Sequence, residues 1–244
     1  MRVRTLSLAV ASAALLGPAV AGCSSSAGPT ARPSTSTPPP TQTSTSSPES
    51  SPASPASSPA TGTPLTLADR LLPTAQVPGL NAQWQWQDGE TGPASTEPFG
   101  TCAKADLLSI GATDVVSRTY LPPDDSDDNA AQQVAEFPDA QTAATAWTVL
   151  KAWHDRCGRA LGADAGLKVG AIQEVPVGSG SAGWYLLSWH PPAEETGRFE
   201  AFGMALDGTR ITVVRIDHSG QDHSYPPGKD PVIGMVTAAA SRLG

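Results

Sequence analysis

Two aspartates and two histidines fall within seven residues near the end of the sequence: Asp217, His218, Asp222 and His223. Imidazole and carboxylate groups are common ligands for transition metals. The segment around them is rich in glycine and proline, however, and polar residues in such loops are usually exposed. The sequence therefore permits a metal or ligand contact here but favours an exposed polar loop, and we predict no metal site.

A second acidic segment matches part of a calcium-binding loop. Asp125, Asp127, Asn129 and Glu136 fall at positions 1, 3, 5 and 12 of the required spacing. Ala130 stands where such loops need a glycine, and the flanking residues are typical of strands rather than helices. We therefore interpret this segment as an acidic turn exposed to solvent.

Three glycines, Gly178, Gly180 and Gly183, fit the G-x-G-x-x-G pattern of dinucleotide-binding loops. Such a loop must lead into a helix, because the helix N-terminus attracts the pyrophosphate. Here the next residues, Trp184 to Leu187, are typical of a strand. The pattern therefore indicates a flexible loop, and we predict no cofactor.

Local motifs for hydrolysis do not occur in the sequence, which contains no nucleophile elbow, no S-x-x-K and no H-E-x-x-H. His154 and Asp155 are neighbours on a predicted helix, so their side chains are expected to point apart. A triad assembled by the tertiary structure would leave no local motif. We nevertheless predict that the protein is not an enzyme.

The chain has six tryptophans although aromatic residues make up only 5% of it. Trp147 and Trp153 lie on the predicted long helix and are assigned to the core. The other tryptophans lie on predicted strands and could line a cleft, because an indole combines an apolar ring with a hydrogen-bond donor. Packing in the core is the favoured alternative for them. The candidate ligand-binding residues are Trp84, Trp86, Trp184, Tyr185, Trp189, His190 and Arg198.

Residues 1–22 are expected to be a signal peptide. Arg2 and Arg4 precede a short apolar run, which is too short to cross a membrane. The run ends in Val20-Ala21-Gly22-Cys23, which resembles a bacterial lipobox. The resemblance implies cleavage before Cys23, lipidation of its thiol and anchoring on the extracytoplasmic face of the cell membrane. An ordinary secretory signal is the alternative.

Residues 23–64 are expected to form a disordered tether behind the lipidated cysteine. They consist almost entirely of Ser, Thr, Pro, Ala and Gly. Without large apolar side chains, such a segment cannot bury enough surface to offset the entropy lost on ordering. Its prolines favour an extended, semi-stiff chain. The alternative is a disordered arm without a selected length.

Residues 65–244 are expected to form one folded domain, since this length supports a core of its own. Three arginines and one glutamate precede residue 65, so the domain has 12 basic and 22 acidic residues and a formal charge of −10. An acidic domain argues against nucleic acid as a partner. Two cysteines remain once Cys23 is lipidated. Because exported proteins fold in an oxidising compartment, we predict a disulfide between Cys102 and Cys157, with a reactive thiol as the alternative.

The strongest helix pattern follows Pro138. Asp139 is a good N-cap residue, and Gly158 is expected to end the helix. Apolar residues recur at every third or fourth position between them, as one face of a helix requires. This face comprises Ala143, Trp147, Leu150, His154 and Cys157.

Runs of strands linked by turns surround this helix. Asp207-Gly208 is a strong hairpin signal, and Asp230-Pro231 favours the start of a final helix. The pattern indicates an α+β fold, in which a mostly antiparallel β-sheet packs with a long central helix and shorter helices, held by one disulfide. The predicted strands are 81–87, 115–121, 131–137, 167–175, 184–190, 199–206 and 210–217, and the predicted short helices are 65–72 and 104–110.

Several segments of the domain resemble the PknH-type extracellular sensor domain of actinobacteria. They are LLPTAQVPG (71–79), Cys102, VAEFPDAQTAATAW (134–147) and the W-x-x-x-C of Trp153 to Cys157. The resemblance covers residues 65–244 and implies a disulfide-stapled α+β domain with a cleft for an extracellular ligand. Members occur on receptor serine/threonine kinases and as separate lipoproteins. They commonly have two disulfides, whereas this chain can form only one.

Three functions follow from these observations. The first is a lipid-anchored, extracytoplasmic, sensor-like domain that binds a ligand and is not an enzyme. The second is a structural or protein-docking lipoprotein of the cell envelope, and the third is a cell-wall-directed hydrolase. For the first, the expected partners are the membrane, through the lipid at Cys23, and an unidentified small molecule or envelope ligand.

Overall fold

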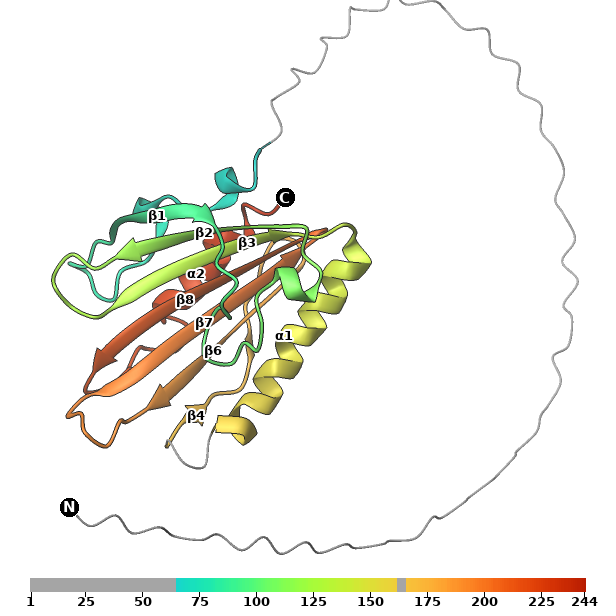
Figure 1. The fold of residues 1–244 in the computed structure, drawn as a ribbon. Helices are drawn as coiled ribbons and strands as arrows, with labels where there is room; N and C mark the ends of the chain where they lie inside the picture. The colour runs from blue at the N-terminus through green and yellow to red at the C-terminus, as the bar shows by residue number, and fades with distance from the viewer. Residues whose placement is uncertain (1–64, 162–165) are drawn as a thin grey trace, which may run out of the picture. The chain divides into compact units, whose positions relative to one another are not determined.

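The computed structural model describes residues 65–161 and 166–244 of the chain (Figure 1). The predicted signal peptide, Cys23 and the tether therefore lie outside the described residues. Within the described residues, the chain forms one antiparallel sheet with helices on both faces. This arrangement confirms the predicted α+β class.

The sheet has eight strands, and every pair of neighbouring strands is antiparallel. Their order is β1-β2-β3-β8-β7-β6-β4, and β5 also pairs with β6. The late strand β8 thus lies beside β3 in the middle of the sheet. The strands are β1 (Gln87–Pro93), β2 (Asp114–Leu121), β3 (Asn129–Glu136), β4 (Lys168–Val169), β5 (Gln173–Glu174), β6 (Ser181–Trp189), β7 (Gly197–Asp207) and β8 (Arg210–Gly220).

Helix α1 (Ala140–Leu161) and helix α2 (Pro231–Ala240) pack on opposite faces of the sheet (Figure 1). The division follows from the alternation of side chains along each strand. On β8, for example, Val213 belongs to the core layer beneath α1, whereas Val214 belongs to the layer beneath α2. Each face of the central strands is therefore buried.

The local signals around α1 explain its start but not its end. Asp139 Oδ1 accepts a hydrogen bond from the backbone N–H of Thr142 at 2.7 Å, which lowers the pKa of Asp139 and confirms its capping role. The predicted stop at Gly158 is wrong, because the helix continues to Leu161. A glycine within a helix costs only about 1 kcal/mol relative to alanine, so it does not by itself end a helix that tertiary contacts hold.

The predicted disulfide between Cys102 and Cys157 is present, with a Cα–Cα distance of 5.2 Å. It joins the loop before the 3₁₀ helix η3 (Leu108–Ile110) to the last turns of α1. Both cysteines are buried in the core layer beneath α1. The bridge therefore fixes this loop and the helix against the same face of the sheet.

Three predicted elements near the start of the domain are wrong or much shorter. The helix predicted at 65–72 is only the 3₁₀ helix η1 (Ala68–Arg70), and the helix predicted at 104–110 is only η3. The strand predicted at 81–87 is irregular as far as Gln87, where β1 begins. Asn81 instead starts a turn, in which the backbone N–H of Trp84 donates a hydrogen bond to the carbonyl oxygen of Asn81.

The later part of the chain follows the prediction more closely. The strand predicted at 167–175 divides into β4 and β5, but β6, β7 and β8 lie where they were predicted. Gly208 has φ +56° in the turn between β7 and β8, a conformation that favours glycine. Asp230 caps α2 by accepting from the backbone N–H of Val232 at 3.0 Å, as its position before Pro231 predicts.

Candidate functional site

The seven predicted ligand-binding residues do not lie in one place. Trp184 and Tyr185 are consecutive on β6 and therefore point to opposite faces of the sheet. Trp184 packs with the layer beneath α2, whereas Tyr185 and Trp189 belong to the layer beneath α1. Tyr185 is stacked on Phe202 with ring centroids 5.1 Å apart, and burial raises the pKa of its hydroxyl.

The two polar residues of the predicted set are also separate from the tryptophans at the start of the domain. His190 is exposed just after β6. Arg198 at the start of β7 donates from Nε to Glu194 at 2.8 Å and lies 3.8 Å from a carboxylate oxygen of Asp127. This arginine therefore joins two surface loops through ion pairs.

Trp84 and Trp86 are brought together, although not on a strand. Their rings contact edge to face, with centroids 5.3 Å apart. Trp86 is buried, and its Nε1–H donates to the carbonyl oxygen of Pro78 at 2.8 Å. The Nε1–H of Trp84 is also inaccessible to solvent, but it has no hydrogen-bond partner among the described residues. A buried donor without a partner is costly, and it marks a position where a ligand or water could accept.

A cleft of about 920 Å³ opens beside these two rings, between the 3₁₀ helix η2 (Thr74–Gln76), the start of β1 and the neighbouring strand β2. We call it the tryptophan cleft. It combines apolar and polar side chains, as small-molecule sites usually do. The apolar part comprises Pro73, Val77, Trp84 and Trp86, and the polar part comprises Thr74, Gln85, Asp88 and Arg118.

The polar side chains of the tryptophan cleft are held in place. Arg118 on β2 donates from Nε to the hydroxyl of Thr91 at 2.7 Å and from Nη1 to the carbonyl oxygen of Leu72 at 2.9 Å. Thr74 donates from its hydroxyl to a carboxylate oxygen of Asp88. Arg118 was not predicted as a site residue. Only the pairing of β1 with β2 brings it to the tryptophans, and no local signal in the sequence could have identified it.

The predicted cluster of aspartates and histidines near the end of the sequence is divided by the sheet. Asp217 and His218 are consecutive on β8 and point to opposite faces. Asp217 pairs with Nε of Arg215 at 2.9 Å. His218 instead lies near His223, with ring centroids 6.1 Å apart, and the ring of Phe199 stacks on it. Asp222 is exposed.

Two buried carboxylates that the sequence did not single out meet these histidines. Asp230 Oδ2 lies 2.7 Å from Nε2 of His223, and both side chains are more than nine-tenths buried. Asp128 Oδ1 lies 3.5 Å from Nδ1 of His218 and accepts from the backbone N–H of Ser219 at 2.9 Å. Asp230 was predicted only as a helix cap, and Asp128 was hidden in the acidic turn before β3.

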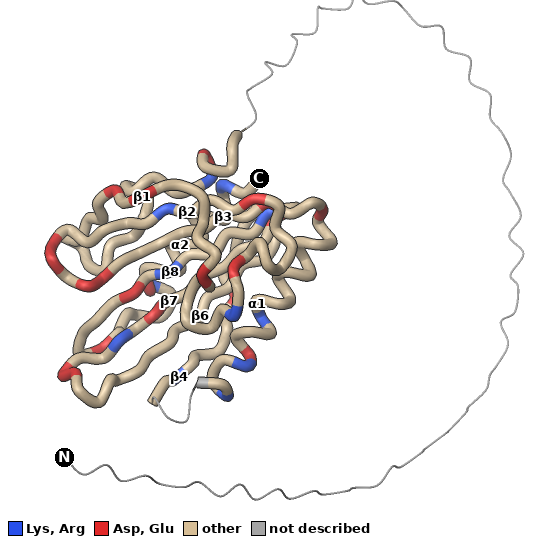
Figure 2. The backbone as a smooth tube through the Cα atoms, viewed as in Figure 1, with Lys and Arg blue, Asp and Glu red and all other residues tan. Residues whose placement is uncertain are grey.

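The calcium spacing is not realised. Asn129 and Glu136 lie at opposite ends of β3, about 24 Å apart along an extended strand. Glu136 binds Arg210 and Thr209 at its own end. The acidic turn between β2 and β3 lies at the other end (Figure 2), where Asp125 is exposed. Nowhere in 65–161 or 166–244 do three His, Cys, Asp or Glu side chains come together as metal ligands.

The glycine-rich segment leads directly into a strand, since β6 starts at Ser181. It therefore lacks the helix that a dinucleotide loop needs.

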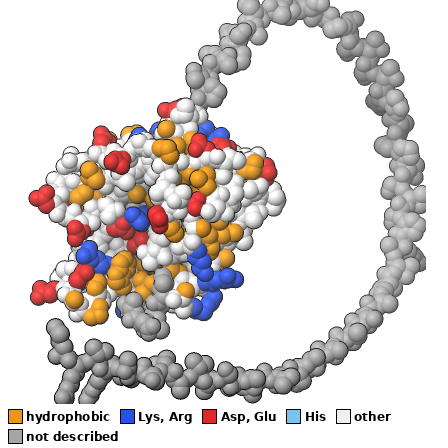
Figure 3. Space-filling view, viewed as in Figure 1, with side chains coloured by type: hydrophobic (Ala, Val, Ile, Leu, Met, Phe, Trp, Pro, Cys, Tyr) orange, Lys and Arg blue, Asp and Glu red, His pale blue; other side chains and the backbone are white. Residues whose placement is uncertain are grey.

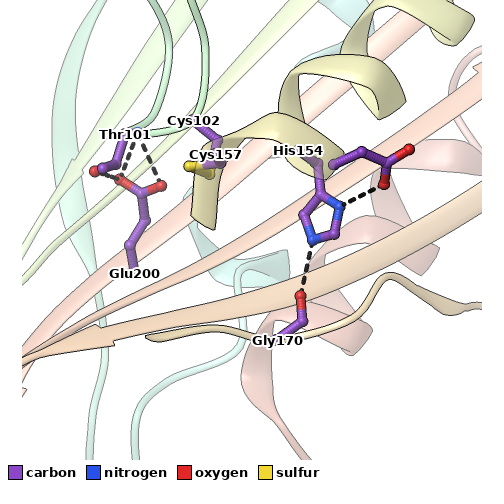
Figure 4. Close-up of a disulfide and its surroundings, with 7 residues drawn as sticks. Thr101, Cys102, His154, Cys157, Gly170 and Glu200 are labelled. Atoms are coloured by element: carbon purple, nitrogen blue, oxygen red, sulfur yellow. Dashed lines mark hydrogen bonds and ion pairs between the residues drawn. A yellow bond between two sulfur atoms is a disulfide. The ribbon is translucent and has the colours of Figure 1, made fainter. Parts of the chain in front are cut away.

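The expected separation of His154 and Asp155 is wrong, because their side chains meet at 3.3 Å (Figure 4). His154 is buried and also bonds through Nε2 to the carbonyl oxygen of Gly170 at 2.8 Å, whereas Asp155 is exposed. The contact with Gly170 ties α1 to the residue after β4.

A buried carboxylate lies next to the disulfide (Figure 4). Glu200 on β7 accepts hydrogen bonds from the backbone N–H of Thr101 at 3.0 Å and from its hydroxyl at 2.9 Å. Burial raises the pKa of Glu200, and the nearby carboxylate of Asp217 raises it further. Burial also raises the pKa of Asp217, against the opposing effect of Arg215. Because Thr101 precedes Cys102, this network holds the disulfide loop on the sheet.

None of the helices in the described parts of the chain has the length and apolar character needed to cross a membrane. The comparison with solved structures gave distant likenesses. The fold is similar to the extracellular domain of PknH from Mycobacterium tuberculosis, with 15% sequence identity and a TM-score of 0.45 over 72% of this chain and 93% of that chain. No family model matches the sequence, and no curated protein matches it either.

Proposed function

We propose that the protein is a lipid-anchored, extracytoplasmic domain that binds a ligand in the tryptophan cleft and does not catalyse a reaction. The buried Cys102–Cys157 disulfide supports an oxidising, exported location. The lipobox-like Val20-Ala21-Gly22-Cys23 supports anchoring to the membrane through Cys23. The composition of residues 24–64, which is rich in Ser, Thr and Pro, supports a tether between the lipid anchor and the folded domain.

The observation that carries the proposal is the pair of indole rings, Trp84 and Trp86, which contact each other with centroids 5.3 Å apart and line an open cleft. The cleft is about 920 Å³, which is within the range of small-molecule sites. Its two indole rings offer apolar faces, and Arg118 and Asp88 offer a donor and an acceptor at the edge. A ligand with an apolar face and several hydroxyl or amide groups, such as an oligosaccharide, fits this combination.

The two other functions have weaker support. Hydrolysis would need a nucleophile beside a base. His223 and Asp230 form a close buried pair, but no Ser, Thr or Cys side chain bonds to either histidine of this cluster in the described residues. Asp230 Oδ1 also caps α2, which gives the pair a structural role.

A docking function would need a broad exposed apolar surface. The large hydrophobic residues exposed in the described part of the chain are Leu65, Leu108 and Leu121, which belong to different segments. On the face seen in Figure 3, hydrophobic side chains form several groups that polar and charged ones separate. We therefore favour the cleft over a docking surface.

The experiment is fluorine NMR of the full chain labelled with 5-fluorotryptophan, which gives one signal for each of its six tryptophans. Soluble oligosaccharides prepared from cell envelopes are the probes. We expect the signals of Trp84 and Trp86, assigned with Trp84→Phe and Trp86→Phe, to shift until saturation. The signal of Trp153 on the opposite face is the internal control. Shifts of all six signals together, or of none with any saccharide, would contradict the proposal.

Substitution of Arg118, the cationic residue at the edge of the tryptophan cleft, gives a second measurement of saccharide binding. Arg118→Gln removes the cation while keeping a donor, and we expect about tenfold weaker saccharide binding. Arg156→Gln, on the exposed side of α1, is the matched control and should bind as the unmodified protein does. Equal binding by both variants would remove Arg118 from the site.

A further inference from the structure

A smaller hollow of about 220 Å³ lies next to the tryptophan cleft, and Trp84 lines both. Its walls come from the segment before β1, the turn before β3, the end of β8 and the loop that follows. We call it the histidine hollow. The residues that the argument uses are Trp84, Asp128, His218, Asp222, His223 and Tyr225.

The two histidines that line the histidine hollow have buried ring nitrogens. The side chain of His223 is 4% exposed, and its Nε2 lies 2.7 Å from a carboxylate oxygen of Asp230. Because a carboxylate accepts, Nε2 carries the proton, and Nδ1 of the neutral ring is an acceptor. This Nδ1 is inaccessible to solvent and has no hydrogen-bond partner among the described residues. Nδ1 of His218 is also inaccessible to solvent, and its nearest acceptor is Oδ1 of Asp128 at 3.5 Å, at the limit of a hydrogen bond.

The charge of the histidine hollow is negative. The Asp128 side chain is 8% exposed and lines the hollow, and Asp222 adds an exposed carboxylate at its edge. Asp230 lies directly behind His223. None of the residues described as lining the hollow is a lysine or an arginine. Outside the hollow, Arg198 pairs with Glu194 and Asp127 and also attracts Asp128, so it offsets part of this negative charge.

Aromatic rings complete the walls. Tyr225 lies edge to face with His223, with ring centroids 4.9 Å apart, and its hydroxyl donates to the carbonyl oxygen of Leu80 at 3.1 Å. This bond fixes the tyrosine ring beside the hollow. Trp84 lines the hollow as well. The faces of such rings attract cations.

We infer that the histidine hollow binds a small protonated primary amine. An ammonium group has three donors and no acceptor, so it matches an unpartnered imidazole nitrogen and a buried carboxylate. Its charge matches both the carboxylates and the aromatic faces. A metal ion fits less well, because among the described residues no three His, Cys, Asp or Glu side chains converge on one point. This site goes beyond the proposed function, since it takes a different chemical group in a different hollow.

The test is proton NMR of the imidazole rings in the full chain, which contains four histidines. The probe is n-butylammonium chloride, compared with n-butanol at equal concentration and with sodium chloride at equal ionic strength. We expect the signals of His218 and His223 to shift with the amine only, with saturation on the order of 1 mM. His154, which lies in the layer beneath α1, and the exposed His190 should not respond.

Substitution of the buried acid gives a second measurement. Asp128→Asn removes the charge but keeps an acceptor for Ser219, and we expect amine binding to weaken by at least about tenfold. Asp125→Asn, an exposed residue in the same turn, is the matched control and should bind normally. If Asp128→Asn does not fold, the NMR titration of the unmodified protein still decides the question.

Three outcomes would overturn the inference. The first is an equal response of the histidines to butanol, and the second is unchanged amine affinity in folded Asp128→Asn. The third is a tight response of His218 and His223 to Zn²⁺ alone, which would make the hollow a metal site. Saccharide binding in the tryptophan cleft is measured from the fluorotryptophan signals, and amine binding in the histidine hollow from the imidazole signals. Either proposal can therefore fail while the other is upheld.

Discussion

Glu200 on β7 and Asp217 on β8 lie directly opposite each other in the sheet, with both carboxyl groups on the face that α1 covers. Carboxylates placed in this way repel each other, and burial adds to the cost of their charge. Arg215, two residues before Asp217, supplies one cation, and Thr101 supplies two hydrogen bonds to Glu200. Glu200 and Asp217 therefore lie at the place where the loop that contains Cys102 contacts the sheet.

This pair predicts how stability depends on pH. Burial raises the pKa of both Glu200 and Asp217 above their unfolded values. The native state therefore binds more protons than the unfolded state once the pH exceeds the usual carboxyl range. Consequently, Glu200 and Asp217 contribute most to the free energy of unfolding below the usual carboxyl pKa range. This contribution falls as the pH rises through their raised pKa values.

Glu200→Gln tests this prediction. We expect the free energy of unfolding of this variant to fall less between pH 4.5 and pH 8 than that of the unmodified domain, as urea unfolding at several pH values would show. Glu174→Gln, on the exposed strand β5, is the control and should follow the unmodified profile. A profile of Glu200→Gln identical to that of the unmodified protein would disprove the role of Glu200.

The disulfide gives a second prediction. It closes a loop with a sequence separation of 55 residues, and replacing both Cys102 and Cys157 with alanine is expected to lower the free energy of unfolding by about 2–4 kcal/mol. Urea unfolding with and without reductant measures the loss. Reductant should affect the unmodified protein but not the double variant. Mass spectrometry after alkylation without reduction should find no free thiol at these two positions.

Arg70 gives a third prediction. Its side chain is buried, and the two hydrogens of Nη1 are shared among backbone oxygens of Arg242, Leu243 and Gly244 at 2.7, 2.9 and 2.6 Å. Arg70→Met keeps much of the volume but removes these donors, so we expect a loss of about 2–3 kcal/mol in the free energy of unfolding. Arg156→Met, on an exposed part of α1, should change it by less than about 0.5 kcal/mol. Similar losses in both variants would show that the contacts of Arg70 with these backbone oxygens do not contribute to stability.

The lipid anchor gives a fourth prediction. Cys23→Ala is expected to abolish labelling by radioactive palmitate and to release the protein from the membrane fraction, because the thiol is the only place for the proposed thioether lipid. Ser24→Ala, the next residue, keeps the thiol and should be labelled normally. Membrane retention of Cys23→Ala would favour an ordinary secretory signal followed by another mode of attachment.

Helix caps and tight turns could be predicted from the sequence, because each depends on residues that are close together along the chain. The cap at Asp139, the helix start at Asp230-Pro231 and the turn at Gly208 depend on residues within four positions of each other, and each is present. The strand predicted around Trp84 is wrong because strand formation depends on a partner. The partner strand β2 pairs with the chain only from Gln87 onward.

The sequence by itself determined the fold class, the disulfide and the presence of tryptophans suited to a cleft. Only the tertiary structure decided which of these side chains meet. Tyr185 lies beneath α1 and Trp84 lies on the other face, although both had been predicted to bind a ligand. The tryptophan cleft needs Arg118 from another strand, and the histidine hollow needs Asp128 from a distant turn. Such contacts arise from strand order and register, which residue types and spacing within one segment do not encode.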